Sequence, residues 1–209
     1  RILVHSQIYD TFVQRLAARA DQIELGDPMK DSTQMGPVIS QAALERCHRF
    51  IATAHSEGGR QVAGTQALEM PSEFAKGYYI RPTVFADVRP DHQLFQEEVF
   101  GPVISITRFE TDDQAIALAN TGDFGLGVSI WSRDIARAHR LSRHIRGGII
   151  WLNDHHRNDP RSVWGGVKDS GFGKENGWDA LRGYLSKKSV VIRTEPGYDD
   201  WFAGSNRYG

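Results

Sequence analysis

The sequence is poor in cysteine, in long apolar runs and in net charge, and each shortage excludes a class of protein. Its one cysteine, Cys47, excludes an internal disulfide and fits a reducing compartment, so a cytoplasmic location is expected. No apolar run approaches the roughly 20 residues of a membrane-spanning helix, and no membrane partner is expected. Because 25 basic residues balance 26 acidic ones, no nucleic-acid partner is expected either.

Metal-binding and phosphate-binding motifs are also missing. His155 and His156 are adjacent but have no further ligand at the spacing of a metal site. The glycines on either side of Lys168 follow neither the P-loop spacing nor the dinucleotide-binding spacing, so we interpret them as positions of close backbone packing. Cys47 lies on the apolar stripe of a predicted helix and is interpreted as a core residue.

Strand-like and helix-like stretches alternate along almost the whole chain. This order predicts the α/β class, with a largely parallel sheet and flanking helices. The helices are expected to be capped or opened by Asp10, Ser40, Asp112 and Asp134. The stretches that are predicted to be strands or extended are residues 2–4, 60–63, 77–85, 103–109, 125–131, 149–153 and 189–193.

The most informative stretch is residues 96–103, where two carboxylates precede a predicted strand. Successive side chains of an extended chain point in opposite directions, so Glu97 and Glu98 are expected to have different roles. One can face a pocket while the other is held by the protein. Gly101 permits a close approach to a ligand or to another element, and Pro102 suits the first residue of a strand.

A second informative stretch is the polar loop from Asn153 to Trp164. It follows a predicted strand, and ligands of parallel α/β sheets bind beyond the carboxyl ends of strands. Loops in that position commonly carry binding residues. Taken alone, these patterns support an α/β domain with a polar loop at a strand end.

Five stretches, in their order and spacing, resemble the aldehyde dehydrogenase superfamily. The resemblance ends near residue 195. The stretches are residues 77–85 (GYYIRPTVF), 97–103 (EEVFGPV), 119–126 (of which AN at 119–120 and FGL at 124–126 match), 148–153 (GIIWLN) and 164–175 (WGGVKDSGFGKE).

The resemblance implies an enzyme that oxidises an aldehyde to a carboxylic acid with NAD or NADP, through a cysteine thioester. Glu98 is similar to the carboxylate that holds the nicotinamide ribose, a role that suits an ionised acceptor. Phe100 resembles the aromatic residue beside the nicotinamide. Asn153 matches an asparagine before the substrate loop, and Glu175 matches a glutamate near the route by which protons leave.

The resemblance also implies that the nucleophile is not in this sequence. In the superfamily the cysteine lies just upstream of the arginine that Arg1 resembles, and Cys47 does not match it. We therefore expect a carboxyl-terminal part of such an enzyme, inactive alone. It would comprise a catalytic-domain portion (1–185), an oligomerisation strand (186–194) that forms a dimer or tetramer through 189–193, and an irregular tail (195–209). The alternative is an inactive, stand-alone binding or oligomerisation module of the same fold.

The substrate is an aldehyde, and the entrance loop leaves two classes open. Arginine binds carboxylate in a bidentate manner, so Arg157, with His155 and His156, favours an aldehyde that carries a carboxylate. The acidic residues of the same loop, with Trp164, favour a cationic aminoaldehyde or betaine aldehyde through charge and cation–π contact.

Overall fold

The computed structural model describes residues 1–194 and 197. Its largest unit is a four-stranded sheet in the order β1-β4-β3-β2. β1 (Ile2–His5) and β3 (Thr83–Ala86) both pair in parallel with β4 (Val103–Phe109), whereas β2 (Arg60–Ala63) pairs antiparallel with β3. The predicted α/β class is confirmed, and the antiparallel β2 makes the sheet a mixed one.

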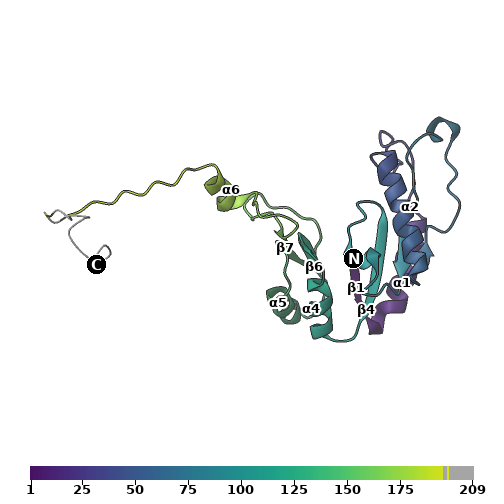
Figure 1. Cartoon of the computed structure of the whole chain (residues 1–209). Helices are drawn as coiled ribbons and strands as arrows, with labels where there is room; N and C mark the ends of the chain where they lie inside the picture. Colours follow the sequence, from purple (N-terminus) through teal and green to yellow (C-terminus); the bar gives the residue numbers. More distant parts are fainter. Residues whose placement is uncertain (195–196, 198–209) are drawn as a thin grey trace.

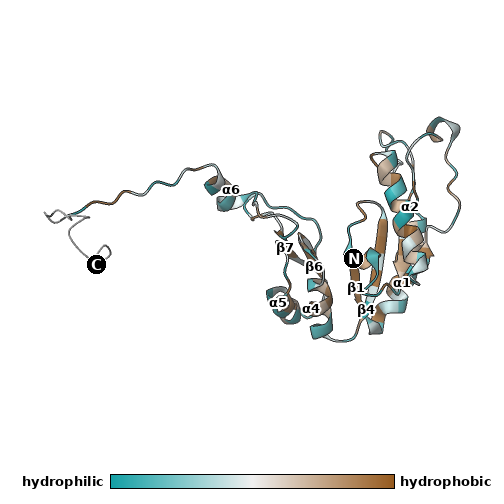
Figure 2. Cartoon of the chain, in the orientation of Figure 1, coloured by the Kyte–Doolittle hydropathy of each residue, from teal (hydrophilic) through white to brown (hydrophobic). Residues whose placement is uncertain are grey.

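Helices cover both faces of this sheet because β3 is apolar on both sides. Phe85 points into a cluster with α2 (Gln41–Ser56), while Val84 and Ala86 point into a second cluster with α1 (Tyr9–Asp21). All four residues of β3 are buried, as expected for a central strand between two layers. In Figure 2 the central strands are coloured mainly as hydrophobic, whereas the helices mix hydrophobic and hydrophilic residues.

A second group of elements follows β4 and forms the other half of Figure 1. β6 (Gly127–Ile130) and β7 (Ile149–Leu152) pair in parallel, and the two-residue strands β5 (Phe124–Gly125) and β8 (Val167–Lys168) pair antiparallel. The helices of this half are α4 (Asp112–Asn120), α5 (Ile135–His144) and α6 (Gly177–Gly183). Short helical turns lie at Ser6–Ile8, Ser72–Phe74 and, as α3, at Gln93–Gln96.

Two of the expected helix caps are confirmed and two are wrong by one or two residues. Ser40 and Asp134 accept hydrogen bonds from the amides three residues later. The cap of α4 is Thr111, because its hydroxyl accepts from the Gln114 amide, while Asp112 pairs with an arginine of α5. Ile8 occupies the cap position of α1, because a 3₁₀ turn runs directly into that helix.

Residues 189–193 do not form the predicted strand within residues 1–194. They run as an extended segment beyond α6 (Figure 1), and Val190, Val191 and Ile192 are 74%, 93% and 76% exposed. β-Branched residues favour strands that pair with other strands, but none of the described strands pairs with this segment, so its exposed backbone is left to water. The expected irregular tail lies outside the described residues, apart from Gly197. Among the described helices, none is both long and apolar enough to cross a membrane.

Candidate functional site

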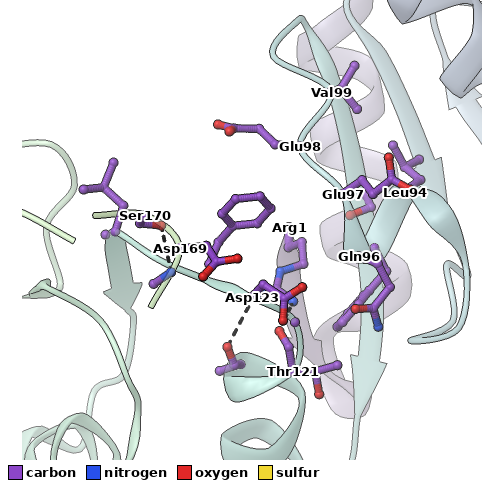
Figure 3. A pocket seen from close by; sticks show the side chains of 18 of the residues that line it. Arg1, Leu94, Gln96, Glu97, Glu98, Val99, Thr121, Asp123, Asp169 and Ser170 are labelled. Atoms are coloured by element: carbon purple, nitrogen blue, oxygen red, sulfur yellow. Dashed lines mark hydrogen bonds between the residues drawn. The ribbon is translucent and has the colours of Figure 1, made fainter. Parts of the chain in front are cut away.

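A cavity of about 650 Å³ lies between the two halves of the chain. One wall is the segment from Leu94 to Gly101, and the opposite wall is residues 121–128 with Asp169 and Ser170 (Figure 3). This volume is within the range of small-molecule and cofactor sites. The most informative motif of the sequence therefore lines a cavity that is large enough for a ligand.

The two adjacent carboxylates have different environments, as expected. Glu97 accepts a hydrogen bond from the Gln93 side chain (3.0 Å), which holds it against α3. The Glu98 carboxylate has no hydrogen-bond or ion-pair partner within residues 1–194, and Figure 3 shows it extending toward the wall that carries Ser170. Glu98 is thus a charged acceptor that lines a cavity and is available to a ligand.

Phe100 presents an aromatic ring beside Glu98. Its side chain is 75% exposed, although Val99 before it is buried in the core. Its φ of 55° lies in the left-handed region that non-glycine residues rarely adopt. Such a conformation persists only where the surroundings fix it, and here the next residue, Gly101, is packed against Cys47: a Cβ on Gly101 would lie 2.3 Å from the Cys47 sulfur.

Cys47 is a packing residue, as predicted. Its side chain is 0% exposed and belongs to the core cluster of α2. Burial raises the pKa of the thiol, and the nearby Arg46 only partly opposes this effect. Since the thiolate is the nucleophilic form, Cys47 is unsuited to attack a substrate.

The opposite wall of the cavity is held by two cations. Arg1 donates to the carbonyl oxygens of Thr121 (2.8 Å) and Ala119 (3.4 Å), and burial lowers the pKa of its guanidinium. Lys168 donates to the carbonyl oxygens of Asn120 (2.7 Å) and Gly122 (2.8 Å). Cations suit these groups because the last carbonyls of a helix are the negative end of its dipole. No sequence pattern indicates this role for either residue.

A second cluster, which we call the aromatic cluster, consists of Trp151, His155, His156 and Trp164. The centre of the Trp151 ring lies 5.8 Å from that of His155, 6.1 Å from His156 and 5.9 Å from Trp164. Trp151 donates from its indole nitrogen to the carbonyl oxygen of Arg157 (2.8 Å), and His155 is hydrogen-bonded to Ser129 (2.8 Å). Three of the four residues were predicted from the sequence as site residues, whereas Trp151, the centre of the cluster, was not.

The charged side chains of the same loop pair with one another. The Arg157 guanidinium lies 3.7 Å from the Asp154 carboxylate, and Arg161 lies 3.4 Å from Asp159. Both arginines are strongly exposed, so these pairs contribute little to stability. The pairing nevertheless leaves the loop with little net charge of either sign around its aromatic rings.

Asn153 and Glu175 make contacts that the sequence did not indicate. The Asn153 side chain bonds to both the amide and the carbonyl of Ser132 (2.8 and 2.9 Å) and so ties the end of β7 to the end of β6. The backbone of Glu175 exchanges two hydrogen bonds with Trp164, each 2.7 Å. A substrate contact by Asn153 and a proton route through Glu175 stay predictions. Neither residue lines the cavity of Glu98, nor do His155, His156, Arg157 and Trp164.

Comparisons with known proteins agree with this arrangement. A profile described as "Aldehyde dehydrogenase family" matches residues 1–190. Betaine aldehyde dehydrogenase of Cereibacter sphaeroides is 44% identical over 94% of this chain, and peroxisomal aminoaldehyde dehydrogenase 1 of Pisum sativum is 37% identical over 97%. The crystal structure of betaine aldehyde dehydrogenase from Staphylococcus aureus in complex with NAD⁺ covers 98% of the chain, with a TM-score of 0.90 and 36% identity. The chain spans 40% of the length of each of these three proteins.

Proposed function

The chain belongs to the aldehyde dehydrogenase family, and we propose that it is part of an NAD-dependent enzyme that oxidises a cationic aldehyde to a carboxylic acid. The observation that carries this proposal is the unpaired carboxylate of Glu98 in a cavity of cofactor size. A cytoplasmic location stays a prediction.

The cavity residues fit a nicotinamide cofactor. Glu98 would accept hydrogen bonds from the two hydroxyls of a ribose, a charge-assisted contact that needs a carboxylate without another partner. Phe100 would pack its exposed ring against the nicotinamide end. When bound, NAD supplies the acceptor for the two electrons that leave the aldehyde. The S. aureus relative, solved with NAD⁺, supports NAD over NADP.

We propose that the nucleophile comes from outside residues 1–209. The reaction of this family needs a thiolate, and Cys47 is buried with a raised pKa. The contribution of this chain would therefore be one side of the cofactor site and part of the substrate entrance. The chain alone is expected not to reduce NAD, whereas the longer protein with its upstream cysteine is expected to do so.

The aromatic cluster supports a cationic substrate. Indole rings attract ammonium groups through the negative face of their π system, and the cluster contains two indoles whose centres are 5.9 Å apart. Arg157 and Arg161 each lie beside a carboxylate, so neither is an unopposed cation for an anionic aldehyde. Relatives named for betaine aldehyde and for aminoaldehydes point to the same class.

Trp164→Ala in the longer protein is expected to lower kcat/KM for betaine aldehyde by about 10- to 30-fold, because a desolvated cation–π contact contributes about 2 kcal/mol. The loss for a neutral aldehyde of similar size is expected to be smaller. Initial rates of NADH formation at saturating NAD would measure both.

Arg157→Ala is the matched control in the same loop, and it is expected to leave the preference between cationic and neutral aldehydes unchanged. A selective loss of activity on carboxylated aldehydes in Arg157→Ala, with no effect of Trp164→Ala, would instead establish the anionic class.

We further propose that residues 189–193 pair with another copy of the protein. This segment exposes three consecutive β-branched residues, and an unpaired extended segment readily adds to a sheet edge.

Val191→Pro removes a backbone donor and is expected to shift the longer protein to a lower mass in sedimentation. An unchanged mass of the Val191→Pro variant would contradict this proposal. Ser189→Ala, at an exposed position of the same segment, is the control and is expected to leave the mass unchanged.

A further inference from the structure

Helix α2 contacts the segment from Gln93 to Gly101 at three successive points. Near its end, the Glu57 carboxylate accepts from the amide of Gln93, at 3.0 and 3.1 Å. Near its middle, the Arg46 guanidinium donates to the carbonyl oxygen of Glu98. Beside Arg46, Cys47 packs beneath Gly101. The segment that carries the cavity carboxylate is therefore attached to this helix before, at and after Glu98.

We propose that Arg46 is a positioning residue for the Glu98 carboxylate, an inference that rests on the proposed function. The Glu98 side chain has no partner of its own among the described residues, so the restraint that they place on it acts through its backbone. The carbonyl of Glu98 is the part of that backbone that Arg46 binds. A guanidinium donor makes a stronger hydrogen bond to a carbonyl than a neutral group does, so this contact restricts rotation of the peptide that follows Glu98.

Arg46 differs from the other two attachments in its burial. Cys47 is in the core, and Glu57 satisfies the start of α3, so replacing either one disturbs packing or secondary structure. Arg46 is only half-buried and is not one of the apolar residues that form the core cluster. Its removal should therefore leave the fold intact and release only the backbone of Glu98. Small displacements of a positioning group are costly for binding and catalysis, which makes such a release measurable.

Arg46→Ala in the longer enzyme is expected to raise the KM and the Kd for NAD by about 5- to 10-fold. The KM for the aldehyde at saturating NAD and the melting temperature are expected to change little. Arg46→Lys keeps a cationic donor and is expected to restore part of the affinity. Arg49→Ala, an exposed arginine one turn further along α2, is the matched control and is expected to behave as the unmodified enzyme.

The double variant Arg46→Ala/Glu98→Gln separates positioning from a merely structural role. If Arg46 acts through Glu98, its replacement has little further effect on NAD binding once Glu98 is changed. Full additivity, or an effect of Arg49→Ala equal to that of Arg46→Ala, would overturn the inference. If Glu98→Gln alone left NAD binding unchanged, the proposed function itself would fail. A loss in Glu98→Gln without a loss in Arg46→Ala would refute only the role of Arg46.

Discussion

Gly148→Ala is expected to destabilise the protein by at least about 3 kcal/mol, the upper range for an overpacked site. A Cβ at this position would lie 1.6 Å from the carbonyl oxygen of Gly165 and 2.6 Å from its carbon. Both are backbone atoms, so no side-chain rotation can relieve the overlap. Gly148 also donates to the carbonyls of Gly125 and Leu126, each at 3.0 Å, so its backbone cannot shift without loss of those bonds. Urea unfolding and soluble yield would measure the effect.

Gly173→Ala is the control, in the glycine-rich stretch around Lys168 that also contains Gly165. A Cβ there would meet no atom of the described chain within 4 Å, and its φ is not in the left-handed region. This variant is expected to change the free energy of unfolding by no more than about 0.5 kcal/mol. Equal losses in the two variants would show that Gly148 is not held against Gly165 in solution.

The glycine-rich stretch illustrates what the sequence could predict. Its spacing excluded a phosphate loop and indicated close backbone packing. That interpretation is confirmed for Gly165 and Gly166 and is wrong for Gly171 and Gly173, where a Cβ would meet no atom of the described chain within 4 Å. The α/β class was also predictable, because alternation of strand and helix patterns depends on residues that are close in sequence. Helix starts were less predictable. A preceding 3₁₀ turn at Ser6–Ile8 moved one cap, and a neighbouring threonine replaced Asp112 as another.

The contacts that fix the site could not be predicted, because they join residues far apart in the chain. Arg46 and Glu98 are 52 positions apart, and Arg1 and Thr121 are 120 apart. No local pattern distinguishes these arginines from solvated ones. The family resemblance identified Glu98 and Phe100 but not Arg46 and Cys47, which hold their backbone in place. The position of Trp151 at the centre of the aromatic cluster likewise depends on how β7 packs against the loop that follows it.

Glu98→Gln in the longer enzyme is expected to weaken NAD binding by about 10- to 100-fold, because hydrogen bonds to a charged acceptor contribute about 1.5–3 kcal/mol. Glutamine keeps the size of the side chain but loses the charge and one of the two acceptor oxygens. The carboxylate has no partner within the described residues, so the change leaves no unpaired group in the protein. Titration of NAD, together with the KM for NAD, would measure the loss.

Glu97→Gln is the control that the sequence itself offers. The two carboxylates are adjacent, equal in charge and both at the cavity wall, so a general effect of negative charge would act on both. Glu97 already accepts from Gln93, and its replacement is expected to alter NAD affinity by less than about threefold. An equal loss in both variants would mean that NAD responds to the charge of the wall and not to a specific contact. A larger loss in Glu97→Gln would exchange the roles of the two residues.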